Sequence, residues 1–148
     1  SFEGQGPMQL EAMVGVPEEP IRLPIDTDAE GVLRVDWAPL LGPLCDAGRG
    51  PEQRAGLFHD TLVASAVEVT RRVAETHRYG AVGLTGGVFQ NRVLSERLAA
   101  ALVGQGVTVC QHRIVPCNDG GLSFGQVMEW AAVEEDNKMR QQRRGHGG

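Results

Sequence analysis

The sequence predicts an α/β fold, in which short strands alternate with amphipathic helices. Two apolar segments of strand length, 80–84 and 107–110, lie on either side of segment 88–103. In that segment the apolar residues recur every three or four positions, as they do on one face of a helix. The order strand, helix, strand is typical of a parallel βαβ unit. A longer helical pattern, 52–78, precedes it. We therefore expect 80–84 and 107–110 to be neighbouring strands.

The first fifty residues predict smaller elements. A short helix is expected within residues 1–15, opening after a Gly-Pro pair. Segments 21–25 and 32–36 alternate apolar and polar residues around a turn-rich connection, a pattern that predicts a β-hairpin. Residues 37–44 are expected to form a short helix that folds onto the hairpin.

The C-terminal end divides into two parts by composition. Residues 121–133 are almost wholly apolar and predict a helix. From residue 134 onward, charged residues, Gln and Gly dominate without any apolar periodicity. We therefore expect a folded unit over residues 1–133 and a disordered tail over 134–148.

Composition limits the classes of function. A chain of 148 residues with 41% apolar residues fits one domain or one lobe of a larger protein. Its net charge of −5 gives no electrostatic reason to expect a nucleic-acid partner. No apolar run is long enough to cross a membrane, and the first residues do not form a signal peptide. We expect a cytoplasmic location and a segment taken from within a longer chain.

The cysteines and helical histidines do not predict a metal centre. Cys45, Cys110 and Cys117 are odd in number and lack C-x-x-C spacing, so neither a disulfide framework nor a structural zinc site is favoured. A cluster of Cys110 and Cys117 with the intervening histidine remains a weaker alternative. His59 and His77 lie in the pattern 52–78 without a second ligand one turn away, and are expected to be ordinary helix residues.

Two glycine-rich turns are the candidate functional motifs. Gly86 and Gly87 join the strand at 80–84 to the following helix, where backbone N–H groups and a helix N-terminus can face an anion. The alternative is a tight connection without a ligand. In the second turn, Asp119 either caps the following helix or presents a carboxylate to a metal near the first turn. The residues alone leave both alternatives open.

Taken together, these stretches resemble a known family. Segments 84–94 (LTGGVFQNRVL) and 116–126 (PCNDGGLSFGQ), with the opening residues 1–5 and 8–12, are similar to the C-terminal part of the HypF carbamoyltransferases, which mature [NiFe]-hydrogenases. The resemblance runs from residue 1 to about residue 133. It implies one lobe of an ASKHA fold (actin, sugar kinase, Hsp70), in which two α/β lobes enclose a nucleotide.

The resemblance also implies an activity and partners. HypF proteins use carbamoyl phosphate and ATP to form carbamoyl-adenylate and pass the carbamoyl group to the C-terminal cysteine of HypE. The implied ligands are therefore ATP and a divalent metal, with zinc confined to upstream domains that this sequence lacks. Two alternatives remain: a lobe of a tRNA-modifying (TsaD-type) or small-molecule O-carbamoyl transferase, and a non-catalytic docking module.

The resemblance assigns residues to the nucleotide. Gly86, Gly87 and Val88 would line its phosphate side, and Asn91 would contact the bound adenylate. Glu3 would lie near the ribose hydroxyls.

The metal site implied by the resemblance is divided between two lobes. Asp119 would be the metal ligand contributed here. The paired histidines of the family belong to the first lobe, and no His-x-x-x-His occurs in this sequence. We therefore expect half a site, and no activity from these residues in isolation.

Overall fold

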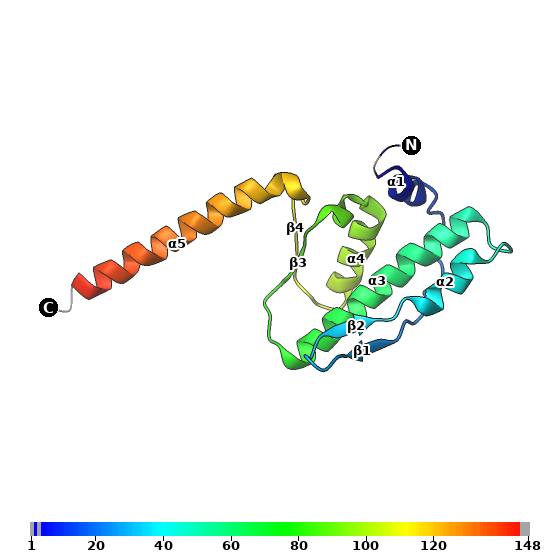
Figure 1. Ribbon diagram of the computed structural model, residues 1–148, viewed down its shortest axis with the longest axis horizontal. Coiled ribbons are helices and arrows are strands. Elements are labelled where there is room, and N and C mark those ends of the chain that lie inside the picture. The colour runs from blue at the N-terminus through cyan, green and yellow to red at the C-terminus, as the bar shows by residue number, and fades with distance from the viewer. Residues whose placement is uncertain (1, 3, 146–148) are drawn as a thin grey trace.

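The computed structural model describes residue 2 and residues 4–145, with side chains up to residue 140. These described residues form both helices and strands (Figure 1). In chain order the elements are α1 (Gln5–Ala12), β1 (Ile25–Thr27), β2 (Leu33–Val35), α2 (Ala38–Cys45), α3 (Pro51–Thr76), β3 (Val82–Leu84), the 3-10 helix η1 (Gly87–Gln90), α4 (Arg92–Gly104), β4 (Val109–Gln111), the 3-10 helix η2 (Asp119–Gly121) and α5 (Leu122–Gly145). The expected α/β class is confirmed.

The two predicted central strands are parallel neighbours. β3 pairs with β4 in a register that places Val82 opposite Val109 and Leu84 opposite Gln111. η1 and α4 connect them, and α4 packs against β4 and α3. Because both strands run the same way, the loops that follow them emerge at the same edge of the sheet. These loops contain the two glycine-rich turns.

The predicted hairpin is also present, in shorter form. β1 and β2 are antiparallel, with Ile25 opposite Val35. β1 begins only after Pro24, whose carbonyl oxygen accepts a hydrogen bond of 2.9 Å from the N–H of Asp36. A proline has no N–H to donate to a strand ladder, which explains why β1 starts at the residue after Pro24.

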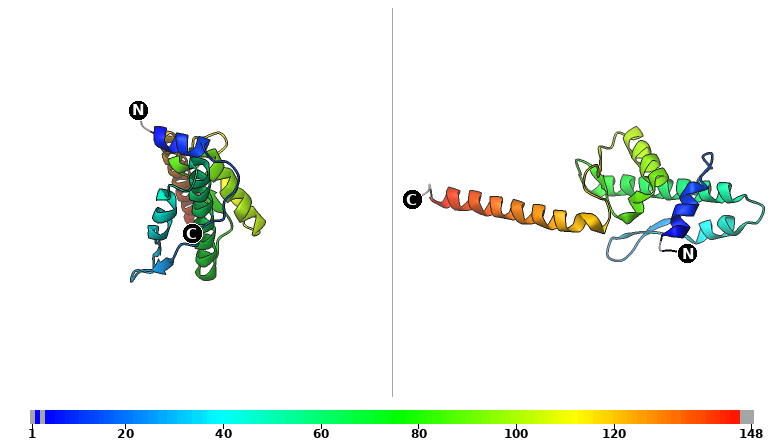
Figure 2. Two further views of the ribbon diagram at one scale, coloured as in Figure 1. Left: turned by 90° about the vertical axis from the view of Figure 1, so that its right-hand side faces the viewer. Right: turned by 90° about the horizontal axis from the view of Figure 1, so that it is seen from above.

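α3 is the central helix of the molecule. It packs against α2 and α4 (Figure 2). One buried cluster joins Leu57 to Leu40 and Leu23, and another consists of residues from β3 and α4 with half-buried residues of α3 packed on it. The close crossing of segment 16–18 favours glycine at position 56, because a Cβ there would lie 3.0 Å from Cγ of Glu18 and 3.2 Å from the carbonyl oxygen of Val16.

Polar contacts hold α3 to its neighbours. The Asp60 carboxylate accepts a hydrogen bond of 2.8 Å from the N–H of Glu18 and one of 2.5 Å from Arg97 on α4. Near the other end, Arg72 donates to the carbonyl oxygen of Ile25 at 2.6 Å and so fixes the hairpin.

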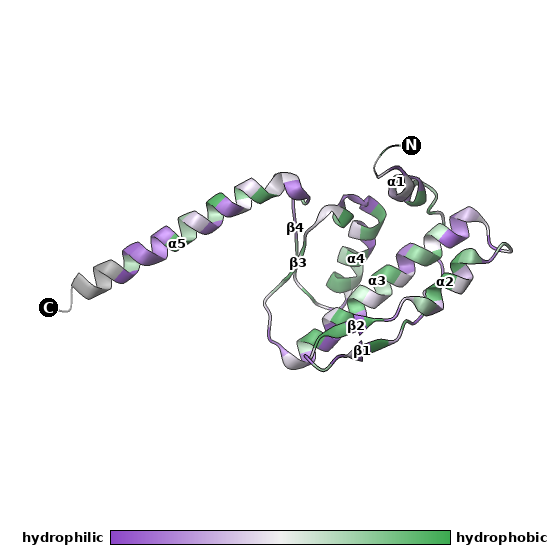
Figure 3. Cartoon of the chain, viewed as in Figure 1, coloured by the Kyte–Doolittle hydropathy of each residue, from purple (hydrophilic) through white to green (hydrophobic). Residues whose placement is uncertain are grey.

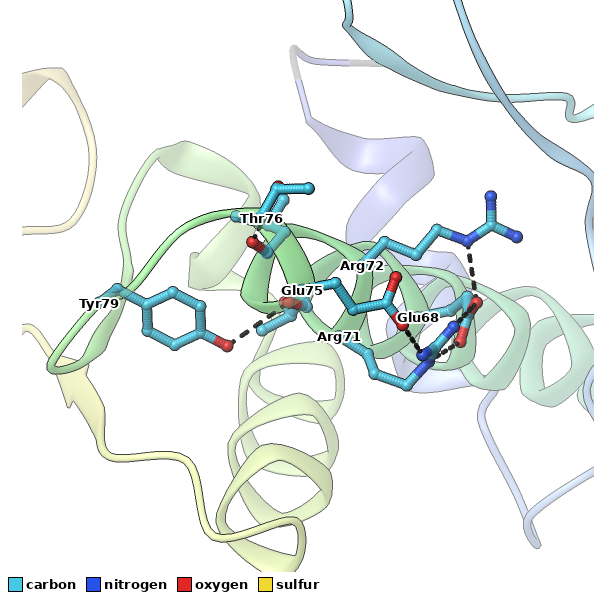
Figure 4. A network of polar contacts seen from close by, with 8 residues as sticks. Glu68, Arg71, Arg72, Glu75, Thr76 and Tyr79 are labelled. Atoms are coloured by element: carbon cyan, nitrogen blue, oxygen red, sulfur yellow. Dashed lines mark hydrogen bonds and ion pairs between the residues drawn. The ribbon is translucent and has the colours of Figure 1, made fainter.

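A charged network covers the exposed side of the same helix (Figure 4). Arg71 donates two hydrogen bonds of 2.9 Å to Glu68, and Arg72 donates one of 2.9 Å. The hydrogen bonds from Arg71 have the largest effect on the Glu68 carboxyl, followed by the bond from Arg72. Together they lower the pKa of Glu68 to about 2. Glu68 therefore stays charged throughout the physiological range. Because the network is exposed, its main effect is to organise the helix surface rather than to stabilise the core.

The predicted helix 88–103 is wrong at its start. Residues 87–90 form η1, and α4 begins only at Arg92. The interruption occurs at Asn91, which has an extended backbone with φ −68° and ψ 106°. Its side chain caps α4 by accepting a hydrogen bond from the N–H of Leu94. The apolar spacing predicted the helix but did not reveal this cap.

The predicted end of the last helix is also wrong. α5 continues without a break from Leu122 to Gly145, so the expected disorder from residue 134 is not found up to residue 145, and residues 146–148 lie outside the described part. The polar residues there are mostly strong helix formers. Asp136 and Arg140 add an ion pair of 2.8 Å one turn apart.

α5 extends away from the other elements as a single rod (Figures 1 and 2). Its first half exposes large apolar side chains, including Phe124, Val127 and Trp130, the last with 66% of its surface exposed. Figure 3 shows apolar positions between polar ones along α5. No helix in the described residues has the length and apolar character required to span a membrane.

Candidate functional site

The first glycine turn follows β3 directly. Gly86 adopts φ 104° and ψ 155°, a conformation that is essentially restricted to glycine. Its N–H donates a hydrogen bond of 2.7 Å to the carbonyl oxygen of Cys117, in the loop before η2. Its own carbonyl oxygen accepts one of 3.0 Å from Phe89, which closes η1. The turn is thus fixed on one side by the second glycine-rich motif.

The two motifs lie side by side. Besides the Gly86–Cys117 hydrogen bond, a Cβ built on Gly87 would lie 3.9 Å from Cβ of Asn118. Both turns leave the same edge of the parallel β3–β4 pair. At such an edge, the carboxyl ends of parallel strands form the usual binding crevice of an α/β sheet.

The second turn is capped by Asn118. Its side-chain oxygen accepts a hydrogen bond of 3.1 Å from the N–H of Gly120. Asn118, and not Asp119, therefore caps the 3-10 helix η2 that leads into α5. Asp119 is exposed, and its carboxylate is not consumed by the cap. This leaves the metal-ligand hypothesis for Asp119 chemically open.

Gly121 permits the close return of the chain onto Pro116. A Cβ at Gly121 would lie 2.5 Å from the carbonyl oxygen of Pro116 and 3.2 Å from Cγ1 of Val115. Neither neighbour is the far end of a flexible side chain, so the backbone would have to move. Glycine at this position therefore determines the shape of the turn that carries Asp119.

We predict that Gly121→Ala in the full-length parent protein lowers the free energy of unfolding by about 1–3 kcal/mol, the usual cost of overpacking. Gly125→Ala is the matched control, because Gly125 lies in the first turn of α5 and a Cβ there would meet nothing within 4 Å. The control is expected to stabilise the helix by roughly 0.5–1 kcal/mol. Chemical denaturation measures both. Equal effects of the two changes would contradict the steric role of Gly121.

The side chain of Asn91 is held by two hydrogen bonds. Its Oδ1 accepts one of 2.9 Å from the N–H of Leu94, and its Nδ2 lies 2.8 Å from Nε2 of His59. His59 was expected to be an ordinary helix residue, but it is fully buried and directly contacts a candidate site residue. The two positions are 32 residues apart, so no local spacing could have indicated the pair.

The remaining candidates have different positions. Val88 lies in η1 with 57% of its surface exposed. Glu3 lies outside the described residues. The nucleotide contacts of Gly86, Gly87, Val88, Asn91 and Glu3 stay predictions.

A pocket of about 390 Å³ adjoins the first turn and was not predicted from the sequence. It is lined by residues of β3, η1, α4 and the loop after β4, among them His112, Arg113 and Cys117. Beside it, Nε2 of His112 lies 2.9 Å from Oγ1 of Thr85. The sequence feature that could have indicated this pocket is the polar group directly after the apolar segment 107–110.

The possible metal ligands are few. The three cysteines are free, and two of them, Cys45 and Cys110, are exposed. In the part of the chain that the structure describes, no three His, Cys, Asp or Glu side chains are grouped so that they could hold a metal ion. A metal at Asp119 would therefore need further ligands from outside these residues.

Comparison with known proteins gives consistent results. The family described as "Carbamoyltransferase, Kae1-like Domain, second subdomain" matches residues 1–126. Carbamoyltransferase HypF of Rhizobium leguminosarum bv. viciae is 34% identical over 144 residues, which cover 91% of this chain and 18% of the relative. Carbamoyltransferase HypF of Rhodobacter capsulatus is 37% identical over 137 residues, which cover 93% of this chain and 18% of the relative.

Solved structures agree with the sequence relatives. A crystal structure of full-length HypF in the phosphate- and nucleotide-bound form matches with a TM-score of 0.79 and 32% identity, covering 84% of this chain and 17% of that one. The crystal structure of T. kodakarensis HypF matches with a TM-score of 0.69 over 92% of this chain and 18% of that one. Its identity of 19% supports the fold alone. The chain thus spans less than a fifth of the length of each of these four relatives.

Proposed function

Since this chain belongs to the HypF family of carbamoyltransferases, we propose that it forms one wall of the nucleotide site in such an enzyme. In this proposal the chain is one lobe of an ASKHA fold, and the opposing wall comes from the upstream part of the parent protein. The parent protein uses carbamoyl phosphate and ATP, by way of carbamoyl-adenylate, to carbamoylate the C-terminal cysteine of HypE.

The observation that carries the proposal is the contact between the two glycine turns. The hydrogen bond from Gly86 to Cys117 brings the Gly86-Gly87 turn next to the turn that holds Asp119. A phosphate needs close approach to the backbone, which glycines without a Cβ allow. It also needs compensation of its negative charge, which a metal held by a carboxylate provides. The full-length HypF solved in its phosphate- and nucleotide-bound form shares the fold over 84% of this chain.

The chemistry of the residues fits a divalent metal at one ligand position. The exposed carboxylate of Asp119 is a hard oxygen donor, the type that Mg²⁺ prefers. When bound, such a metal would offset negative charge on the phosphates. The residues of this chain would bind and orient: Gly86 and Gly87 would leave room for the phosphates, and Asp119 would fix the metal on one side.

Asn91 and Val88 would complete the wall. Asn91 would present the remaining N–H of its amide to the adenylate, because its other N–H and its oxygen are already engaged. Val88 would offer an exposed apolar surface beside the phosphates. Glu3 would reach the ribose hydroxyls, as the family resemblance implies.

A mass-spectrometric assay tests the proposal. We expect the full-length parent protein, given carbamoyl phosphate and ATP, to add one carbamoyl group to HypE at its C-terminal cysteine. HypE without that cysteine is the control and should stay unmodified. Modification of tRNA in place of HypE would favour the tRNA-modifying alternative. Failure to bind ATP or to modify any acceptor would reduce the chain to a docking module.

A further inference from the structure

A continuous chain of hydrogen bonds links the buried interior of α3 to the start of α4. Nδ1 of His59 lies 2.8 Å from the carbonyl oxygen of Ala55, and Nε2 lies 2.8 Å from Nδ2 of Asn91. Oδ1 of Asn91 lies 2.9 Å from the N–H of Leu94. His59 has no exposed surface, so water does not compete for either ring nitrogen.

The chemistry of these groups allows only one direction for the chain. A carbonyl oxygen accepts only, so Nδ1 of His59 carries the hydrogen that is donated to Ala55. In the neutral ring Nε2 then has a lone pair and accepts from the amide of Asn91. The amide oxygen is left to face the N–H of Leu94. The bond to His59 and the helix cap thus specify the same orientation of the Asn91 amide.

Asn91 lies at the junction of the turn and the helix. Its N–H donates a hydrogen bond of 3.1 Å to Val88 in η1, and its carbonyl oxygen accepts one of 3.0 Å from Ser95 in α4. A displacement of Asn91 would therefore move η1, which begins at Gly87, relative to α4. The position of the turn depends on a side chain from another helix.

We propose that His59 is a positioning residue for the nucleotide turn: it holds the Asn91 amide so that η1 and the Gly86-Gly87 turn keep the geometry that receives the nucleotide. The inference rests on the proposed function, because it concerns the same nucleotide site. His59 itself does not touch the nucleotide. Its effect passes through Asn91.

Four variants of the full-length parent protein test this. His59→Leu keeps a side chain of similar size but removes both ring nitrogens, whereas His59→Gln keeps an acceptor able to reach Asn91. Asn91→Ser keeps an oxygen that can cap α4 but has no amide to bond His59. The fourth variant combines His59→Leu with Asn91→Ser. ATP affinity is measured by calorimetry, and hydrogen exchange is followed in peptides covering residues 87–97.

His59→Leu is expected to weaken ATP binding about fivefold and to accelerate exchange in residues 91–95, as the loss of one hydrogen bond predicts. His59→Gln should restore both to within about twofold of the parent protein. In the Asn91→Ser background, His59→Leu should have no further effect on affinity, because the contact is already absent.

The outcomes separate the inference from the proposed function. If the unaltered parent protein does not bind ATP, the proposed function fails and the inference fails with it. If the parent binds ATP and His59→Leu changes neither affinity nor exchange, the inference alone is overturned. A loss of affinity that is equally large in the Asn91→Ser background would also overturn it, because His59 would then act by another route.

Discussion

Asp119→Ala in the full-length parent protein is expected to reduce carbamoyl transfer by at least about a hundredfold, as when one group that stabilises developing charge is removed. The fold should persist. Asp119 is exposed, and the adjacent turn is capped by Asn118, so the change falls among surface substitutions within about 0.5 kcal/mol of neutral. Transfer to HypE by mass spectrometry and thermal unfolding measure the two quantities.

Asn118→Ala provides the opposite pattern as a control. It removes the oxygen that accepts from Gly120, so it should cost about 0.5–2 kcal/mol of stability, the usual range for a lost cap. It leaves the Asp119 carboxylate in place, so transfer should remain within about an order of magnitude of the parent. Near-normal transfer by Asp119→Ala would make Asp119 only a turn residue.

The elements that could be predicted from the sequence are those defined by local patterns. β3, α4 and β4 were expected near their observed positions, because apolar residues at periods of two and 3.6 depend only on neighbouring residues. The parallel pairing of β3 and β4 also follows from the order of the elements. The two glycine turns could be located for a similar reason, since a strand that ends in Gly-Gly needs a special backbone.

Features that depend on distant contacts could not be predicted. The hydrogen bond between His59 and Asn91 joins α3 to α4 across 32 positions, and no periodicity reports such a contact. The later start of α4 coincides with the extended backbone of Asn91, which interrupts the helical pattern. The choice of Asn118 as the cap of η2 could not be predicted either, since Asn and Asp both cap helices well.

The length of α5 shows where prediction from composition fails. Charged composition without apolar periodicity suggested disorder, because such a segment cannot bury a core. A helix of strong helix formers can nevertheless continue from a preceding one, since extension costs less than nucleation. The apolar spacing in the first half of α5 predicts a helix, but it does not identify what packs against that helix. In the structure Phe124 and Trp130 are exposed.

The isolated chain of 148 residues is expected to bind ATP weakly or not at all and to transfer no carbamoyl group. A site between two lobes gains affinity and excludes water when both lobes close on the ligand. This chain offers the Gly86-Gly87 turn, Asn91 and Asp119, which form one wall. A single carboxylate in water holds a divalent ion poorly, because Mg²⁺ and Ca²⁺ need six or more oxygen ligands in all.

Calorimetric titration of the isolated chain with ATP and Mg²⁺, beside a turnover assay with carbamoyl phosphate, tests this expectation. The full-length parent protein under the same conditions is the control. Circular dichroism establishes that the isolated chain is folded, so that weak binding is not the result of unfolding. Micromolar affinity for ATP, or genuine turnover, would mean that the wall formed by Gly86, Gly87, Asn91 and Asp119 is a complete site. The dependence on an opposing lobe, which follows from the single carboxylate, would then have to be abandoned.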